Sequence, residues 1–366
     1  MTTGVSSCGS TGGTSSVTAT GSTLTIYASA PANAPYSADL LDAERLAFQQ
    51  FQSSGTKISK FTVKFAAATA SKISDNARTA IEDTGAVAYI GELWPGASAE
   101  TMGITNAQDL LQVSPTDTAI ELTQTTSAVP GAPNDYYESR KTYGRTFARV
   151  VPDAAREAKA QVQAMSSLGV KSLYVTSDDS PYGAAVAQAV KSDASGAGLT
   201  VSPSKAGADG IFYGGGASSA SAFDALASAN PTVKLFGPSG LAAAGPPAGD
   251  HNVYVSVPGF LPKELPAPGK TFVSDFTSAY GHAPATEAVF GFEAVRAVLT
   301  VLQEAGAKAS DRATVARDFF GLKAGANSAV GPYSINSSGD TSISPFVLTR
   351  SLAGKLVPFR SLQAQG

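Results

Sequence analysis

The chain has 366 residues, only 15% of them charged, and a formal net charge of -3 at pH 7. Because one hydrophobic core rarely grows this large, two lobes are expected. The small negative charge gives no electrostatic basis for binding nucleic acid or an anionic membrane surface. The sequence has no apolar run of about twenty residues, the length that crosses a bilayer.

Cys8 is the only cysteine, which excludes internal disulfides and cysteine-based zinc sites. The run VSSCG at residues 5–9 has the form of a bacterial lipoprotein cleavage box, in which small residues precede the cysteine that becomes lipidated. A tract of glycine, serine and threonine follows, as in a flexible tether. We therefore predict a lipoprotein-like tether over residues 1–22, lipidated at Cys8. The alternative is an unmodified cysteine in a disordered tail.

Strand and helix patterns alternate along the next part of the chain. Residues 23–27 and 62–65 are rich in β-branched and apolar residues and predict strands. Residues 38–52 and 71–83 predict helices, the first of them with a clear apolar face. Regular alternation of this kind is typical of a parallel sheet with helices on both faces and right-handed crossovers. The predicted fold class is α/β, with two Rossmann-like lobes.

Two neighbouring strands are each followed by a polar turn. The first strand, over residues 87–90, leads into ELWPGAS at residues 92–98, which contains a large aromatic and a small hydroxyl side chain. After a short helix, the second strand, over residues 111–113, leads into SPTDT at residues 114–118. Ligands of open α/β sheets bind at the carboxyl ends of strands, beside helix N-termini. We therefore predict that the two turns form a cradle for a small molecule.

The second half of the chain continues the alternation. A strand over residues 170–175 leads into the turn DDSPYG at residues 178–183. Two further strand ends follow at residues 209–215 and 235–240. A long proline-free helix over residues 287–306 is expected to cover a lobe face and needs no functional explanation.

The order and spacing of these motifs closely resemble the periplasmic branched-chain amino-acid binding proteins, the type I solute-binding family that serves ABC transporters. In that family a strand ends in an SP-x-x-T sequence followed by an EL dipeptide, here Ser114-Pro115, Thr118 and Glu121-Leu122. The run FARVVPD at residues 147–153 resembles the family's first crossover between lobes. No single motif is specific, but their order along most of the chain is.

The resemblance implies two discontinuous lobes joined by a three-segment hinge. The N-terminal lobe is expected to contain residues 23–148 and 257–330. The C-terminal lobe is expected to contain residues 149–256 and 331–366. Gly331-Pro332 suits a crossing where the chain must bend.

The resemblance also implies a ligand site between the lobes, formed by Tyr36, Glu92, Trp94, Ser98, Asp117, Thr118, Tyr182, Gly216 and Ser239. Tyr36 lies near the family's tyrosine in the first strand-to-helix loop. Thr118, with the N–H groups of Asp117 and Thr118, matches the family's carboxylate-binding turn. Tyr182 matches the aromatic residue with which the opposite lobe closes over the ligand.

Several of these residues also have an ordinary structural explanation. Trp94, the only tryptophan, is expected to form an apolar wall for the ligand, and the alternative is core packing. Ser98 and nearby N–H groups are expected to hold a carboxylate, and the alternative is a helix N-cap. Glu92 and Asp117 are ambiguous, because a carboxylate in a cleft can bind an ammonium, bind a hydroxyl or cap a helix.

The sequence departs from the family at two positions. Ser239 stands where members that bind an α-ammonium place an acidic residue, and Gly216 stands where an aromatic residue often occurs. A buried ammonium without a carboxylate partner is costly. Either Glu92, Asp117 or Asp179 supplies that carboxylate, or the ligand has no α-amino group. An aromatic or extended carboxylate, or a small amide, is therefore also a candidate ligand.

Catalysis is not expected. The two histidines, His251 and His282, lie in loops without a recognisable catalytic setting, and no G-x-S-x-G sequence accompanies them. Clustered metal ligands and a phosphate loop are also missing from the sequence, so neither a metal nor a cofactor is predicted.

We expect an extracytoplasmic substrate-binding protein of an ABC transporter, periplasmic or at the cell surface. It is expected to capture an amino acid or a related small carboxylate or amide when its lobes close. Its expected partners are this ligand and a transporter permease, and it is expected to be a monomer that meets the membrane only through the lipid anchor. The alternative is a ligand-sensing regulator or receptor domain of the same fold.

Overall fold

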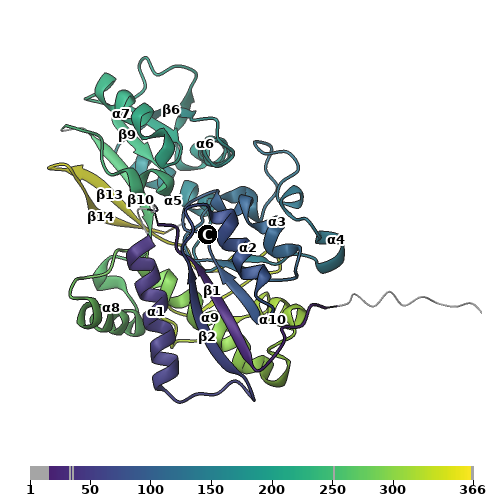
Figure 1. The fold of residues 1–366 in the computed structure, drawn as a ribbon. Helices are drawn as coiled ribbons and strands as arrows, with labels where there is room; N and C mark the ends of the chain where they lie inside the picture. The colour runs from purple at the N-terminus through teal and green to yellow at the C-terminus, as the bar shows by residue number, and fades with distance from the viewer. Residues whose placement is uncertain (1–15, 33, 35–36, 250–251, 364–366) are drawn as a thin grey trace, which may run out of the picture.

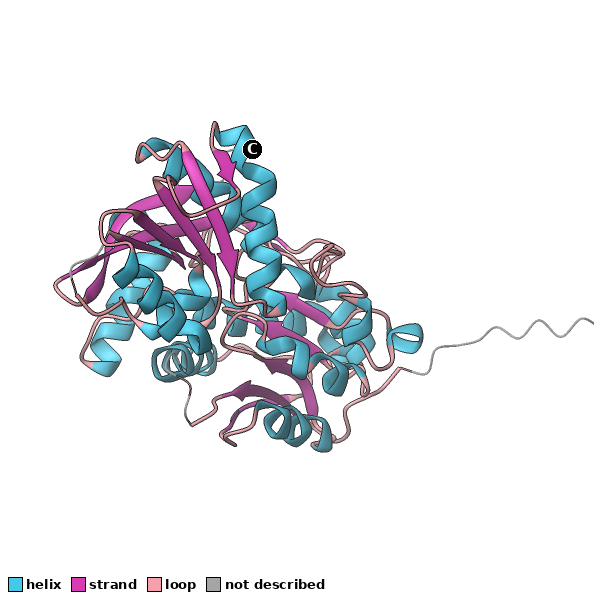
Figure 2. Ribbon diagram, turned by 90° about the horizontal axis from the view of Figure 1, so that it is seen from above, coloured by secondary structure: helices cyan, strands magenta, loops and turns pink. Residues whose placement is uncertain are grey.

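The computed structural model describes residues 16–32, 34, 37–249 and 252–363. The described chain forms two lobes, each built around its own β-sheet (Figure 1). Seen from above, helices flank the strands of both sheets (Figure 2). The predicted lipidation site Cys8 and the predicted ligand contact Tyr36 lie outside the described residues.

The first sheet has five strands in the order β2-β1-β3-β4-β5, and every neighbouring pair is parallel. The strands are β1 (Thr23–Ser29), β2 (Thr62–Ala68), β3 (Ala86–Ile90), β4 (Leu111–Ser114) and β5 (Phe147–Arg149). Every residue of β3 and β4 is buried, as expected for central strands that helices cover on both faces. The carboxyl ends of these parallel strands meet at one edge of the sheet.

Helices from distant parts of the sequence surround this sheet. They are α1 (Ser37–Ser53), α2 (Ile73–Glu82), α3 (Met102–Asn106), α4 (Arg140–Tyr143), α8 (Ala267–Tyr280), α9 (Ala288–Ala305) and α10 (Arg312–Phe319). α9 packs against α1 and is apolar around most of its circumference, which is typical of a buried helix. Its Phe290 and Val298 share the main core with Leu24 and Ile26 of β1.

The second sheet has seven strands in the order β14-β13-β10-β9-β8-β6-β7. Five of them pair in parallel, namely β6 (Ser172–Ser177), β7 (Thr200–Ser202), β8 (Gly210–Gly214), β9 (Lys234–Gly237) and β10 (Val253–Pro258). An antiparallel hairpin completes the sheet, formed by β13 (Pro345–Leu352) and β14 (Lys355–Gln363). The helices of this lobe are α5 (Ala154–Ser167), α6 (Pro181–Ala194) and α7 (Ala220–Ala229).

The chain passes between the two sheets three times. It does so after β5, after β10, and between β12 (Tyr333–Ser334), which pairs with β11 (Lys323–Ala324), and β13. Tyr333 and Ile335 pack in the core of the first lobe, so the third crossing lies beyond residue 331. The lobe division predicted from the sequence remains a proposal.

The predicted α/β fold class is confirmed, because both sheets are largely parallel and helices connect their strands. The hairpin of β13 and β14 was not predicted. Its turn, Ala353-Gly354, has φ angles of 49° and 72°, the backbone that a type I′ hairpin turn requires. None of the described helices combines the length and the apolar character needed to cross a membrane.

Candidate functional site

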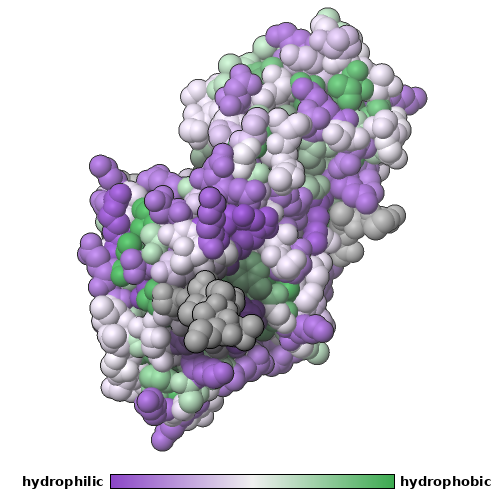
Figure 3. Space-filling view, turned by 90° about the vertical axis from the view of Figure 1, so that its right-hand side faces the viewer, coloured by the Kyte–Doolittle hydropathy of each residue, from purple (hydrophilic) through white to green (hydrophobic). Residues whose placement is uncertain are grey.

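A cavity of about 520 Å³ lies between the two lobes, lined by segments that follow strands of both sheets. In the space-filling view the molecule narrows between these lobes (Figure 3). The lining residues are Pro31, Ala34, Ser71, Trp94, Pro95, Gly96, Ala97, Ala99, Glu121, Tyr136, Ser180, Pro181, Tyr182, Gly216, Ala217, Ser218, Gly240 and Ala243. This position matches the rule that ligands of open α/β sheets bind beyond the carboxyl ends of strands.

The walls of the cavity are mostly small and apolar. Three aromatic residues, Trp94, Tyr136 and Tyr182, supply the large surfaces, and glycine, alanine, proline and serine supply most of the rest. Glu121 is the one charged residue among the described residues that line it. Cavities of this size and composition suit a small molecule with a substantial apolar part.

The turn after β3 places Trp94 at the cavity. Gly96 has a φ of 85°, a left-handed conformation that favours glycine, and a short 3-10 helix (Ala97–Glu100) follows it. A side chain at Gly96 would also approach the Cβ of Tyr182 to 3.5 Å. A Cβ would fit at this distance, so it is the left-handed backbone of the turn that favours glycine here.

Asp117 binds this turn from the neighbouring strand end. Its Oδ1 accepts a hydrogen bond from the N–H of Gly96 at 2.7 Å, and its Oδ2 accepts one from the N–H of Ser98 at 2.8 Å. Burial raises the pKa of Asp117, although the N–H groups of Ser98 and Gly96 oppose the rise. The N–H groups predicted to hold a ligand carboxylate near Ser98 are thus engaged by a carboxylate of the chain itself.

Glu92 and Ser98 lie behind the cavity wall and do not line it. The hydroxyl of Ser98 accepts a hydrogen bond from the N–H of Glu92 at 3.0 Å. The carboxylate of Glu92 accepts hydrogen bonds from Ser29 Oγ and Tyr89 Oη, both at 2.6 Å. Burial raises the pKa of Glu92 to about 7, and these two hydroxyl donors oppose that rise. In this geometry both residues hold the turn that carries Trp94.

Thr118, Tyr182 and Ser239 meet where the two lobes touch. The hydroxyl oxygens of Thr118 and Ser239 are 3.1 Å apart, and those of Tyr182 and Ser239 are 3.4 Å apart. The hydroxyl of Tyr182 also accepts a hydrogen bond from the N–H of Gly240 at 3.1 Å. These hydroxyl groups connect the turn after β4 to the turn after β9. Of the three, only Tyr182 also lines the cavity.

The loops of the second lobe position Tyr182 and Gly216. Ser180 caps α6 by accepting a hydrogen bond from the N–H of Gly183 at 3.0 Å. The Asp178 carboxylate accepts from the N–H of Gly216 at 3.2 Å and so fixes the loop after β8. Asp179, considered above as an ammonium partner, lies outside the cavity lining and accepts a hydrogen bond from Ser177 Oγ at 3.3 Å.

Sequence reasoning missed Glu157, which lies directly behind Ser239. The N–H of Ser239 donates to its Oε1 at 2.6 Å, and the Ser239 hydroxyl donates to its Oε2 at 3.0 Å. Burial raises the pKa of Glu157 to about 7, although hydrogen bonds from Ser256 and Ser239 oppose the rise. The sequence signal was available, because Glu157 and Gln161 are polar residues on the buried stripe of α5.

The sequence indicates Glu121 only as part of a family motif, yet Glu121 is the acid that lines the cavity. Glu121 is only 1% exposed, and its Oε2 has no hydrogen-bond partner among the described residues. Burial raises its pKa to about 7; Asp117 adds to the rise and Arg149 opposes it. Burial and the Glu121 charge also raise the pKa of the neighbouring Tyr136 to about 12.

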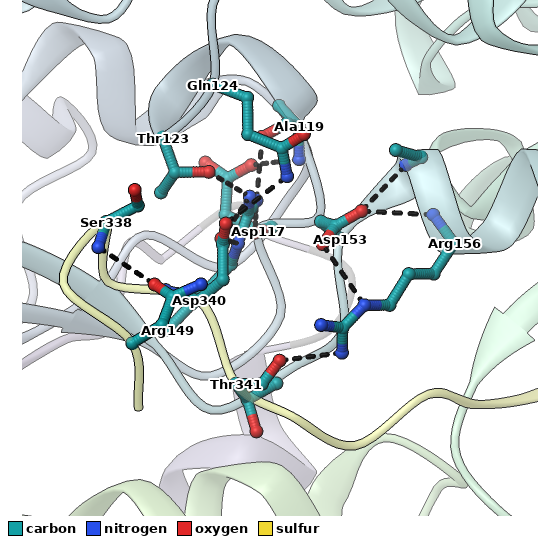
Figure 4. A network of polar contacts seen from close by, with 12 residues as sticks. Asp117, Ala119, Thr123, Gln124, Arg149, Asp153, Arg156, Ser338, Asp340 and Thr341 are labelled. Carbon is teal, nitrogen blue, oxygen red and sulfur yellow. Dashed lines mark hydrogen bonds and ion pairs between the residues drawn. The ribbon is translucent and has the colours of Figure 1, made fainter. Parts of the chain in front are cut away.

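Arg149 holds the second turn in place from behind (Figure 4). Its Nε donates to Asp340 Oδ1 at 2.8 Å, and its Nη1 donates to the carbonyls of Asp117 and Ala119 at 3.1 and 2.7 Å. Its Nη2 donates to Thr123 Oγ1 at 2.6 Å. The guanidinium is therefore fully used by Asp340, which lies between β12 and β13, and by the segment that follows β4.

Comparisons with solved structures identify the fold. A substrate-binding protein of an ABC transporter from Desulfitobacterium hafniense, in complex with Leu, is 19% identical and has a TM-score of 0.73, with 92% of this chain and 100% of that chain covered. A leucine-binding protein from Thermotoga maritima is 17% identical, with a TM-score of 0.72 and coverage of 93% and 99%. A solute-binding protein from R. palustris, in complex with benzoate, is 20% identical, with a TM-score of 0.69 and coverage of 94% and 98%. At these identities the likeness shows a shared fold.

The family is shown by the sequence itself. No curated protein shows significant sequence similarity to the chain. Residues 26–355, however, match the model of the family described as periplasmic binding protein, which covers far more than half of the chain. The two-lobed architecture agrees with this match. The chain therefore belongs to the periplasmic binding protein family and has the two-lobed fold of type I.

Proposed function

We propose that the protein is the substrate-binding component of an ABC transporter and captures a small solute in the cavity between its lobes. The observation that carries this proposal is that both lobes line the cavity. Trp94 and Glu121 come from the first lobe, and Tyr182 and Gly216 come from the second. A solute in this position would touch both lobes only when they lie close together, so capture and lobe closure would be coupled.

The proposed ligand is an amino acid or a related small carboxylate or amide. The volume of about 520 Å³ lies within the range of small-molecule sites, roughly 300–1,000 Å³. Among the structural neighbours, the protein from D. hafniense is in complex with Leu and the protein from R. palustris is in complex with benzoate. These two ligands support the size class, and they differ in whether an ammonium group is present.

The proposed mechanism is a shift between open and closed arrangements of the lobes. A ligand changes such an equilibrium only if it binds the closed arrangement more tightly. Contacts from the second lobe, above all with Tyr182, would supply this difference. A transporter permease would then recognise the surface of the closed form. We place the protein outside the cytoplasm as a monomer and propose Cys8 as its lipid anchor.

Replacing Tyr182 by Ala tests the proposal. In ligand-stripped protein, calorimetric affinity for a solute that binds the wild type should fall at least about tenfold, or 1.4 kcal/mol, because the second lobe loses its aromatic contact. Tyr143→Ala is the matched control, since Tyr143 lies outside the cavity lining. Unchanged affinity in a folded Tyr182→Ala protein would argue against capture between the lobes.

A further inference from the structure

We propose that Glu121 determines the specificity of the cavity and selects a ligand that presents an N–H donor group on an apolar body. The inference rests on the proposed function, because it assigns the chemistry of the solute that the cavity captures. The donor group has two possible sources, the ammonium of an amine and the N–H groups of an amide, and the experiment below separates them.

The position of Glu121 is the first step. Its side chain lines the cavity, and a Cβ built at Gly96 would lie 3.9 Å from Glu121 Oε1 and 3.5 Å from the Cβ of Tyr182. The carboxylate thus lies close to the junction of the two lobes, where a captured solute would be enclosed. Its Oε2 is buried and has no hydrogen-bond partner among the described residues. A buried acceptor without a partner destabilises a protein, and a ligand that supplies a donor removes this cost.

Arg149, the cation that acts on the pKa of Glu121, does not donate a hydrogen bond to the Glu121 carboxylate. Arg149 opposes the raised pKa of Glu121, which places its positive charge within electrostatic reach. All of its nitrogens nevertheless have other partners, namely Asp340, Thr123 and the carbonyls of Asp117 and Ala119. The Glu121 carboxylate, which lines the cavity, therefore has no ion-pair partner among the described residues.

The charge of the cavity argues against recognition of a carboxylate. The described lining contains no lysine, arginine or histidine, and residues 33, 35 and 36, which flank Ala34 in the sequence, are Asn, Pro and Tyr. Two carboxylate anchors were predicted. The N–H groups of Gly96 and Ser98 at the first already bind Asp117, and at the second the N–H of Asp117 donates to Ser114 Oγ at 2.8 Å, while Thr118 does not line the cavity. An anionic ligand would lie beside Glu121 without a compensating cation, which is unfavourable in a buried site.

The remaining walls define the rest of the ligand. Trp94, Pro95, Ala97, Pro181 and Tyr182 present apolar surface around the carboxylate. Such walls favour an aliphatic or aromatic body by burial of apolar area. A donor head group and an apolar body together describe an amine or an amide of small size.

The test uses ligands with one body and three head groups. Stripped wild-type protein is titrated by calorimetry with 3-methylbutylamine, 4-methylpentanamide and 4-methylpentanoate, and in parallel with benzylamine, phenylacetamide and phenylacetate. We expect the amine or the amide of a series to bind at least about tenfold more tightly than its carboxylate. Stronger binding of the amine identifies an ammonium ligand, and stronger binding of the amide identifies a neutral one.

Two variants connect this preference to Glu121. Glu121→Gln keeps the shape of the side chain and removes its charge, so affinity for the amine should fall at least about tenfold relative to wild type. Glu100→Gln is the matched control, because Glu100 is an exposed residue at the end of the neighbouring turn, in the 3-10 helix Ala97–Glu100. It should leave every affinity unchanged.

The possible failures are distinguishable. If the carboxylates bind best, or if Glu121→Gln leaves all affinities unchanged in a folded protein, the role of Glu121 is refuted and the proposed function stands. If no probe of either series binds the wild type at millimolar concentration while leucine does, a donor group on an apolar body is not sufficient, and the proposed ligand class of a simple amine or amide is refuted. If no small solute binds at all, the proposed function itself fails.

Discussion

Replacing Asp340 by Asn removes the counter-charge of a fully buried arginine at the junction of the lobes. Arg149 and Asp340 have side-chain exposures of 0% and 6%, and their closest atoms are 2.7 Å apart. Burial alone would raise the pKa of Asp340, but the Arg149 guanidinium holds it below its ordinary value. Asn is nearly the same shape, so the change isolates the loss of charge.

The expected loss of stability is about 3 kcal/mol. Breaking a buried ion pair from one side costs about 3–5 kcal/mol, and Asn retains one acceptor for Arg149, which favours the lower end. Unfolding entropy of about 2.1 cal/mol/K per residue gives about 0.8 kcal/mol/K for 366 residues. A loss of about 3 kcal/mol therefore lowers the Tm by roughly 4 °C.

Urea unfolding and scanning calorimetry at neutral pH measure this difference. Asp75→Asn is the control, because the Arg78–Asp75 pair is also within hydrogen-bond distance, at 3.0 Å, but has side chains that are 55% and 52% exposed. Its effect should stay within about 0.5 kcal/mol. If Asp340→Asn loses no more stability than Asp75→Asn, the reasoning about the buried charge is refuted.

Two further predictions concern the fold around the site. Burial raises the pKa of Glu92 and Glu157 from 4.5 to about 7, so the folded state binds more protons than the unfolded state between these two pH values. The free energy of unfolding should therefore fall as pH rises from about 4.5 to 7. Urea midpoints that rise over this range would contradict this prediction. Gly214→Ala should destabilise the second lobe by about 1–3 kcal/mol, because its Cβ would lie 2.3 Å from the carbonyl oxygen of Gly183. Thermal unfolding checks this against Gly196→Ala, where nothing lies within 4 Å; equal Tm values would refute it.

Much of the fold could be predicted because it depends on local patterns. The run AVAYI reads as a buried strand since every residue is apolar, and it forms β3 with all five residues buried. Trp94, Tyr182 and Gly216, which were predicted as ligand contacts, line the cavity, because turns that follow neighbouring parallel strands meet at one edge of a sheet. Their roles in binding remain predictions.

The carboxylates could not be assigned from the sequence, because their roles depend on partners that are distant along the chain. Asp117 is satisfied by N–H groups of a turn that precedes it by about twenty residues, whereas Glu121, four residues later, keeps one oxygen free. Glu157 meets Ser239 only through the packing of α5 against the second sheet. Composition and spacing do not distinguish these three acids.

Fluorescence of Trp94 tests the central claim, capture of a solute between the lobes, most directly. Trp94 is the only tryptophan of the chain and it lines the cavity, so its emission reports on this site alone. Stripped protein is titrated with leucine and with the amines, amides and carboxylates named above, while calorimetry is run on the same samples. The account predicts a saturable change in emission at the concentrations where calorimetry detects binding. Calorimetric binding that leaves the emission of Trp94 unchanged would place the ligand elsewhere and contradict the claim.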